Sequence, residues 1–225
     1  IVQWHGVDNS IYDLVDRPEF MHKILTKMTD ALLDLIDQTE RLGYLKEHNQ
    51  LIHCTGAYTY DEHVTEEGKK TSGMNAWTFG MSQIFSTVSP QMHEEFEVPY
   101  LSRLFARFKN VYYGCCEPLH DKVDMIRKYP NVRKISMSPW ANKRKGAEAI
   151  HGDYVYSAKP SPAFLAYPSF NPDAVRADLV ETIGICKENH TNCELILKDI
   201  STTRNHPERV FEWAKIATDL VQKEC

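Results

Sequence analysis

The alternation of strand-like and helix-like segments limits the folds open to this chain more than any other feature of its sequence. Short runs of β-branched and aromatic residues are followed by amphipathic helical patterns, and several of these runs lie only about 20 residues apart. Such spacing is typical of right-handed crossovers, in which helices join parallel strands. The sequence therefore predicts an α/β fold with a parallel sheet.

The predicted elements cover most of the chain. Strands are expected at 50–58, 75–85, 110–117, 131–138, 153–160 and 193–201. Helices are expected at 18–42, 91–108, 118–129, 139–152, 171–189 and 205–224, each with a proline at or near its start. The second of these helices also contains Pro99, which is expected to kink or split it.

A TIM-type (β/α)8 barrel fits this order better than a doubly wound sheet, because no G-x-G-x-x-G fingerprint follows a predicted strand. The doubly wound sheet remains the structural alternative. We expect a single barrel domain over residues 1–225. Because the chain begins with Ile1 and only six strands are predicted, we expect that N-terminal strands are missing and that this is the C-terminal part of a longer chain.

Composition narrows the possible partners and the compartment. The formal charge of -5 comes without a basic cluster, so nucleic acid is not an expected partner. No apolar run approaches the roughly 18 to 20 residues that span a bilayer, and a cytoplasmic protein that does not bind membranes is predicted. Six cysteines in so long a chain are too sparse for a disulfide scaffold, and we expect free thiols at Cys54, Cys115, Cys116, Cys186, Cys193 and Cys225.

The ends of the predicted strands are unusually polar, and in a parallel α/β barrel the active site lies at the C-terminal ends of the strands. The residues with the most reactive or charged side chains at these ends are Cys115, Cys116, Glu117, Lys198 and Asp199. The residues that we expect to contact a substrate are His53, Tyr58, Gln83, Tyr113, Ser138, Trp140 and Lys159.

Two lysines are prominent among these candidates. Lys159 and Lys198 each follow an apolar strand, where an unpaired charge is costly, so each needs a partner or a ligand. The functional interpretation makes them anion-binding groups. The structural alternative is an ion pair within the fold, for example between Lys198 and Glu117.

The adjacent thiols have several interpretations. A thiolate is a zinc ligand and a nucleophile, and the amides of a helix beginning just after Cys116 would lower the pKa of these thiols. Cys115, Cys116 and Glu117 are the candidate metal ligands, which His53, Cys54 or His120 could complete. No C-x-x-C or H-E-x-x-H spacing supports a metal site, and a thiol pair that is merely packed at a tight turn is the structural alternative.

Two stretches together resemble the uroporphyrinogen decarboxylase superfamily. They are "MSQIFSTVSPQMHEEFEVPYLSRLF" and "NVYYGCCEPLHDKVDMIRKYPNVRKISMSP", in which a Ser-Pro helix precedes a strand that ends in H-x-C-G in the family. The later "NHPERVFEWAKIA" is similar to the closing helix of that superfamily. The resemblance covers the chain from about Trp77 to its end and implies a (β/α)8 barrel.

The resemblance implies two activities. One is zinc-dependent methyl transfer between a methylcobamide, which is a corrinoid, and a thiol; the other is decarboxylation of a porphyrinogen or another carboxylate without a cofactor. The family's zinc ligands are the His and Cys of H-x-C and a later Cys. In this chain the His position holds Tyr113, the Cys position holds Cys115, and Lys198 and Asp199 stand where the later Cys is expected.

We therefore carry three hypotheses forward. The first is a methyltransferase-like enzyme, in which Cys115 or Cys116 binds zinc or activates an acceptor while Glu117 and Lys198 hold the substrate. The second is a metal-free carboxy-lyase with Lys159 and Lys198 as anion-binding groups. The third is a barrel without catalysis that binds a small ligand or a corrinoid protein. The resemblance also implies a homodimer.

Overall fold

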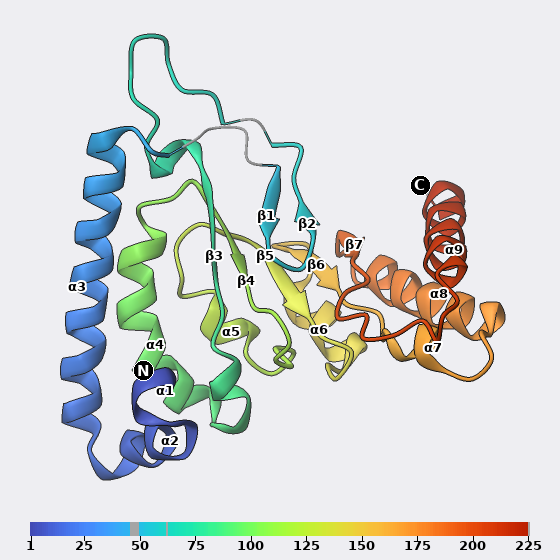
Figure 1. Ribbon diagram of the computed structural model, residues 1–225, viewed down its shortest axis with the longest axis horizontal. Coiled ribbons are helices and arrows are strands. Elements are labelled where there is room, and N and C mark those ends of the chain that lie inside the picture. Colours follow the sequence, from blue (N-terminus) through green and yellow to red (C-terminus); the bar gives the residue numbers. More distant parts are fainter. Residues whose placement is uncertain (46–49, 62, 225) are drawn as a thin grey trace.

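A five-stranded parallel sheet forms the centre of the fold in this computed structural model, which describes residues 1–45, 50–61 and 63–224 (Figure 1). The strands are neighbours in sequence order. They are β3 (Trp77–Gly80), β4 (Asn110–Tyr113), β5 (Val132–Met137), β6 (Val155–Ala158) and β7 (Cys193–Leu195). The predicted α/β class and parallel sheet are confirmed, although each strand is shorter than the apolar run that predicted it.

Helices connect these strands or follow the last of them, and they pack on one face of the sheet (Figure 1). They are α4 (Pro90–Phe105), α5 (Val123–Ile126), α6 (Lys143–Ile150), α7 (Ala163–Ala166), α8 (Pro172–Glu188) and α9 (Glu208–Glu224). Two short 3-10 turns, η1 (Gly73–Asn75) and η2 (Gln83–Thr87), flank β3. Three helices precede the sheet, namely α1 (Val2–His5), α2 (Val7–Asp16) and α3 (Pro18–Leu42).

The long helices begin and end where the sequence predicts. Helix α3 starts with Pro18 in its first turn and ends at Gly43, whose φ of 73° gives the left-handed cap that glycine adopts at low cost. The Ser89 hydroxyl caps α4 by accepting a hydrogen bond from the Met92 amide at 3.1 Å. Pro99 lies inside α4, which continues through it to Phe105, so the helix is not split.

Two predicted elements are wrong. The run 50–58 is not a strand of the parallel sheet but an antiparallel hairpin of β1 (Leu51–His53) and β2 (Ala57–Tyr58), because Gly56 allows the chain to reverse with a φ of 86°. The predicted helix 118–129 shrinks to the single turn of α5. The residues from Cys116 to Asp121 precede it as a loop.

The two faces of the sheet differ in chemistry. Side chains such as Tyr113, Ile135, Met137 and Tyr156 pack against the helices and form the main apolar core. The opposite face carries Tyr112, which packs with Trp77 of β3 and with Ile52 and Ala57 of the hairpin. The other buried residues that alternate with the helix-facing ones along the strands are polar, namely Lys134, Ser136, Ser157 and Lys159. We call this the hairpin face of the sheet.

Candidate functional site

The C-terminal end of β4 brings the two adjacent thiols against Lys198, which follows β7. The Nζ atom of Lys198 lies 2.9 Å from Sγ of Cys116 and 3.9 Å from Sγ of Cys115. The two sulfur atoms are 3.5 Å apart, and Lys198 also forms an ion pair with Asp199. Lys198 therefore contacts two cysteines that lie 83 and 82 positions before it in the sequence. We call Cys115, Cys116, Lys198 and Asp199 the thiol cluster.

Electrostatics separates the roles within the thiol cluster. Burial raises the pKa of Cys115 to about 12, helped by its contact with Cys116, so Cys115 is a neutral thiol near pH 7. Burial opposes the charge on Lys198, but its hydrogen bonds to Asp199 and Cys116 raise its pKa overall. The Lys198 contact in turn lowers the pKa of Asp199. Lys198 is thus a fixed ammonium beside Cys116, a half-buried sulfur.

Glu117 makes contacts of a different kind from those of the thiols. Its buried carboxylate accepts hydrogen bonds from the Cys115 amide at 2.9 Å and the Ser82 amide at 3.2 Å. It therefore joins the end of β4 to the end of β3, and it does not pair with Lys198. The helix expected just after Cys116 begins only at Val123, so the predicted helix N-terminus does not lie directly after these thiols.

The metal hypothesis needs a ligand set that the site does not supply in this arrangement. Cys115 and Cys116 face the Lys198 ammonium, which lies where a zinc ion would have to contact both sulfurs. Glu117 uses its oxygens on backbone amides. Within the described parts of the chain, no three His, Cys, Asp or Glu residues are grouped to hold a metal ion. The predicted zinc ligands therefore do not fit the ion as they stand.

A second polar cluster lies on the hairpin face around Lys159, which is only 2% exposed. Lys159 Nζ donates to the Tyr112 hydroxyl at 2.5 Å and to Ser157 Oγ at 2.8 Å, and those two oxygens are 2.7 Å apart. Burial lowers the pKa of Lys159 to about 7; the Glu194 carboxylate and Cys115 oppose this shift, and the Lys198 and Lys134 charges add to it. Lys159 is therefore partly a neutral amine near pH 7.

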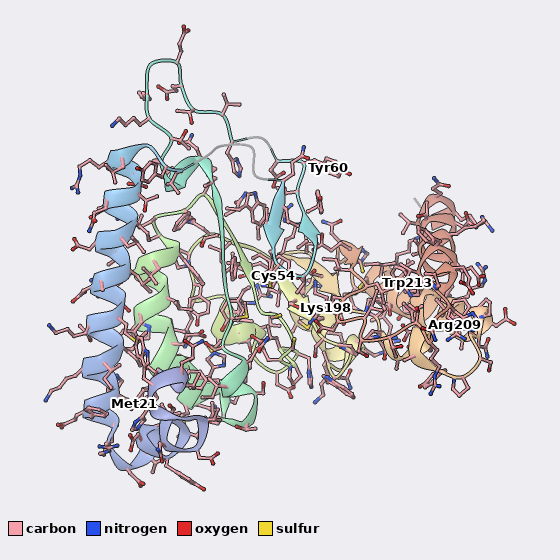
Figure 2. The ribbon with its side chains drawn as sticks, in the orientation of Figure 1. Met21, Cys54, Tyr60, Lys198, Arg209 and Trp213 are labelled. Carbon is pink, nitrogen blue, oxygen red and sulfur yellow. The ribbon has the colours of Figure 1, made fainter. Side chains whose placement is uncertain are left out.

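His53 completes this second cluster. Its ring stacks on that of Tyr112 with centroids 4.7 Å apart, and burial together with the charges of Lys159 and Lys198 lowers its pKa to about 4. Its Nε2 atom is buried with no hydrogen-bond partner among the described residues. We call His53, Tyr112, Ser157 and Lys159 the amine cluster. In Figure 2 the labels of Lys198 and of Cys54, which follows His53 in the turn of the hairpin, lie near each other at the lower end of the hairpin.

The remaining predicted contact residues are not part of either cluster. Ser138 is buried at the end of β5, where its hydroxyl has no partner among the described residues. Tyr58 is 55% exposed and Trp140 is 80% exposed. Gln83 is exposed in η2. Of the predicted contact residues, only His53 and Lys159 belong to the amine cluster, which is close enough to Lys198 for its charge to act on both.

Tyr113 points to the other face of the sheet. Its hydroxyl donates to the Glu97 carboxylate of α4, which also accepts from Tyr129 at 2.5 Å and lies 2.5 Å from His93 Nε2. Burial opposes the negative charge of Glu97, but bonds from His93, Ser82 and Tyr113 lower its pKa. Tyr113 is thus a buried member of a helix-side network. Alternation along β4 requires this separation, because Tyr112 occupies the hairpin face.

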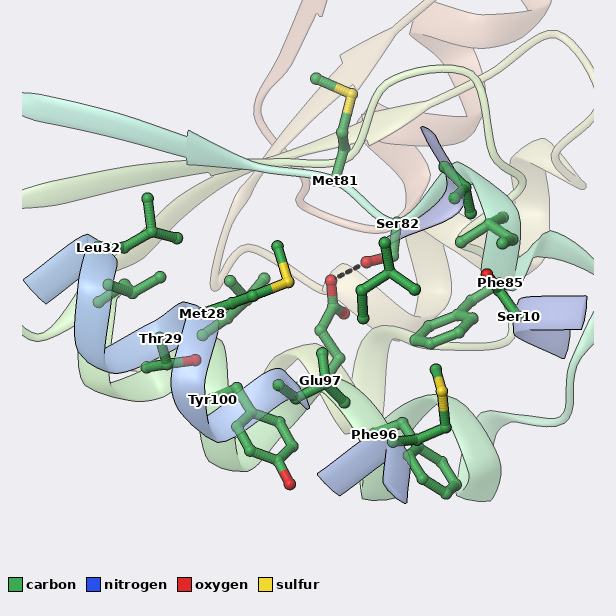
Figure 3. A pocket seen from close by; sticks show the side chains of 17 residues that line it. Ser10, Met28, Thr29, Leu32, Met81, Ser82, Phe85, Phe96, Glu97 and Tyr100 are labelled. Carbon is green, nitrogen blue, oxygen red and sulfur yellow. Dashed lines mark hydrogen bonds between the residues drawn. The ribbon is translucent and has the colours of Figure 1, made fainter. Parts of the chain in front are cut away.

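Glu97 and Ser82 also border an apolar cavity of about 320 Å³ between α3 and α4 (Figure 3). Its other walls are mainly aliphatic, aromatic and methionine side chains, including Met28, Leu32 and Phe96. The cavity lies on the helix side of the sheet and is separate from both clusters. Sequence reasoning did not find it, because its walls come from elements far apart in the chain.

Tyr112 and Ser157 are site residues that the sequence does not single out. Both lie inside apolar strand patterns, which predict core positions. The available signal was the period of two: Ser157 and Lys159 must share one face of their strand, so that face is polar. No sequence pattern shows that Tyr112 of a different strand reaches them.

The fold and these clusters define an α/β protein with candidate chemistry at the carboxyl ends of its parallel strands. Comparisons with protein-family models, with curated proteins and with solved structures find no match for this chain. Among residues 1–45, 50–61 and 63–224, no helix has the length and apolarity needed to cross a membrane.

Proposed function

We propose that this chain is part of a methyltransferase-like enzyme in which Cys116 is the reacting thiol. The observation that carries the proposal is the 2.9 Å contact between Cys116 Sγ and the Lys198 ammonium. Sulfur is the most nucleophilic atom of the cluster, and its contacts with the Lys198 ammonium and with Asp199 Oδ2, at 3.6 Å, fix its position. Cys115, whose pKa is raised, remains protonated and can donate to its neighbour.

The proposed step is a simple displacement. The Cys116 thiolate attacks the methyl carbon, a sulfur–carbon bond forms, and the donor leaves with the electron pair of the bond that breaks. A methyl-corrinoid is the donor class that the sequence resemblance implies. Lys198 stabilises the thiolate before transfer, and Asp199 holds Lys198 through their ion pair. No step is assigned to zinc, because Lys198 faces the two sulfurs.

We further propose that the five strands belong to a TIM-type (β/α)8 barrel. The support is the strand order, which follows the sequence without the reversal of a doubly wound sheet. The polar residues of the hairpin face would then lie inside the barrel, and both clusters would lie toward its C-terminal mouth. Completing the barrel requires strands in addition to β3–β7.

The test of methyl transfer uses methylcobalamin as donor and the thiol of Cys116 as acceptor. Consumption of methylcobalamin is followed by its absorbance, and S-methylcysteine is located by peptide mass spectrometry, with the intact protein and with Cys116→Ser. We expect the variant to lose activity by about 100-fold or more. The matched control is Cys54→Ser, which removes an exposed thiol outside the thiol cluster. Equal turnover by Cys116→Ser and the intact protein would exclude Cys116 as the reacting group.

A metal-free carboxy-lyase is the second candidate, and the positive charge at the strand ends favours it. Lys198 stays charged and Lys159 lies near it on the buried face, which suits a carboxylate substrate. This candidate predicts release of carbon dioxide that survives chelators and the double change Cys115→Ser, Cys116→Ser. Carbon dioxide production that disappears in Lys198→Met but not in Lys143→Met would support it.

A further inference from the structure

We propose that Lys159 forms an imine with a small 2-oxo acid, bound between His53 and Lys198. The amine cluster supplies a nucleophilic nitrogen, two hydroxyl groups that can move a proton, and an unused hydrogen-bond donor. This inference does not depend on methyl transfer or on Cys116. It assigns to Lys159 a covalent function rather than the anion-binding function expected from the sequence.

His53 gives the clearest sign of a ligand. Its Nδ1 atom accepts a hydrogen bond from the Thr55 amide at 3.2 Å, so the neutral ring carries its proton on Nε2. That N–H group is buried, and the described residues offer it no acceptor. A buried donor without an acceptor is costly, and an oxygen of a bound ligand would satisfy it. The ligand should therefore carry an acceptor oxygen facing His53.

The surroundings of Lys159 suit imine formation. Its neutral amine attacks the carbonyl carbon, a nitrogen–carbon bond forms, and the carbonyl oxygen leaves as water after taking up protons. The Tyr112 and Ser157 hydroxyls contact both Nζ and each other, so they can pass the protons between nitrogen and oxygen. Burial raises the pKa of Tyr112, so its hydroxyl is protonated near pH 7 and has a proton to give during the reaction.

The two lysines have different roles in binding the ligand. Lys198 is held as an ammonium by Asp199 and can bind the carboxylate of the ligand. Lys159 has no carboxylate within hydrogen-bond distance among the described residues, and its described partners are two hydroxyls. Since Lys159 is almost fully buried under the hairpin, the ligand must be small. A 2-oxo acid of two or three carbons combines the carbonyl, the carboxylate and the size.

The imine would supply a defined reactivity. Once protonated, the carbon–nitrogen double bond withdraws electrons from the neighbouring carbon, which is the chemistry of bond making and breaking next to a carbonyl group. The proposed reaction class is therefore carbanion-type chemistry on a small oxo acid. It would run on the hairpin face, next to the thiol cluster.

Borohydride trapping tests the imine directly. The intact chain is incubated with glyoxylate or pyruvate, reduced with sodium borohydride, digested, and examined by peptide mass spectrometry. Hydride converts the imine to a stable secondary amine, so the label should appear on Lys159. We expect Lys159→Arg to lose the label while keeping a positive charge, and Lys143→Met, which changes a lysine outside the cluster, to keep it. Circular dichroism shows whether each variant is folded.

Two further measurements separate a site from chance labelling. The labelling rate should rise as pH increases through about 7, because only the neutral amine attacks. His53→Phe, which keeps a ring but removes the donor, should reduce the labelling of Lys159 by about tenfold. Label spread over exposed lysines with none on Lys159, or unchanged labelling of Lys159 by His53→Phe, would overturn the proposal. Neither result would bear on turnover by Cys116.

Discussion

Lys159 and Lys198 follow neighbouring strands and are both buried, yet their pKa values move in opposite directions. The difference lies in their partners. Lys198 has the Asp199 carboxylate and a thiol, whereas Lys159 is hydrogen-bonded to two neutral hydroxyls. A single apolar strand pattern ending in lysine therefore produces two different chemical groups, and only tertiary contacts distinguish them.

The effect of Lys198 on Cys116 can be measured as thiol reactivity. In Lys198→Met the cation 2.9 Å from the sulfur is lost, so the thiolate is less stabilised. We expect alkylation of Cys116 by iodoacetamide at pH 7 to slow by about tenfold. The control Lys143→Met removes a lysine that pairs with Asp178 and Glu181 on the helix side. An equal rate in Lys198→Met and the intact protein would contradict the assigned contact.

His53 should make stability depend on pH. Its folded-state pKa of about 4 lies below the ordinary value of 6.5, so the unfolded chain gains a proton first as pH falls. The stabilisation is present above pH 6.5 and is lost between 6.5 and 4. Between pH 7 and pH 5 the intact protein should lose about 2 kcal/mol more unfolding free energy than His53→Phe. Urea unfolding at both pH values measures this, and parallel losses would exclude the effect.

The residue types of the site could be predicted, but their grouping could not. Cys115, Cys116, Lys198, Asp199, His53 and Lys159 were all found as polar groups at predicted strand ends. The contact between Lys198 and Cys116 depends on the registers of β4 to β7, which no local pattern sets. The structural alternative of an ion pair between Glu117 and Lys198 does not form, because backbone amides of two strand ends bind the Glu117 carboxylate.

At the scale of elements, the packing of β3 on α4 depends on the absence of a side chain at Gly80. A Cβ atom there would lie 2.4 Å from Cζ of Phe105, whose ring is buried. Gly184 lies inside α8, and a Cβ there would meet no atom within 4 Å. The two glycines therefore offer a matched pair for the same substitution.

Alanine should have opposite effects at these two glycines. Gly80→Ala should lower the free energy of unfolding by about 1 to 3 kcal/mol, because the ring of Phe105 must shift. Gly184→Ala should raise it by about 0.5 to 1 kcal/mol, because alanine is the better helix residue. Chemical denaturation checks both values. A neutral Gly80→Ala would mean that Phe105 has room to move.

The elements that were predicted well are those with strong local signals. Helices α3, α4, α8 and α9 combine helical periodicity with a proline near the start, and these signals need no tertiary information. The predictions for the hairpin segment and for α5 were wrong for a different reason. A short apolar run fits a parallel strand, a hairpin or a buried loop equally well, and long-range pairing decides among them.

At the scale of the whole molecule, Lys134 links the hairpin to the sheet. Its Nζ atom donates to the Tyr58 carbonyl and to Glu194 of β7, each at 2.7 Å. The hairpin therefore covers the amine cluster through a contact that spans several elements. This contact controls how well residues 51–58 are held against the buried face.

Hydrogen exchange can test this link. Lys134→Met should speed amide exchange in residues 51–58 by about tenfold, because it removes the hairpin's charged hydrogen bond. Glu194→Gln is the comparison, since it keeps the Lys134 bond to Tyr58 and should change this exchange much less. If amide exchange in residues 51–58 is equally fast in both variants, the ion pair between Lys134 and Glu194, and not the bond to the Tyr58 carbonyl, holds the segment.

Neighbouring residues of β4 carry the two buried polar systems to opposite sides of the sheet. Tyr112 joins the amine cluster and Tyr113 joins the Glu97 network, and burial raises the pKa of both hydroxyls. In ultraviolet spectroscopy, neither ring should contribute phenolate absorbance during mild alkaline titration of the folded protein. Their phenolate absorbance would appear only when the sheet unfolds and exposes the two rings to water. Absorbance during alkaline titration would therefore report the unfolding of both faces of this strand.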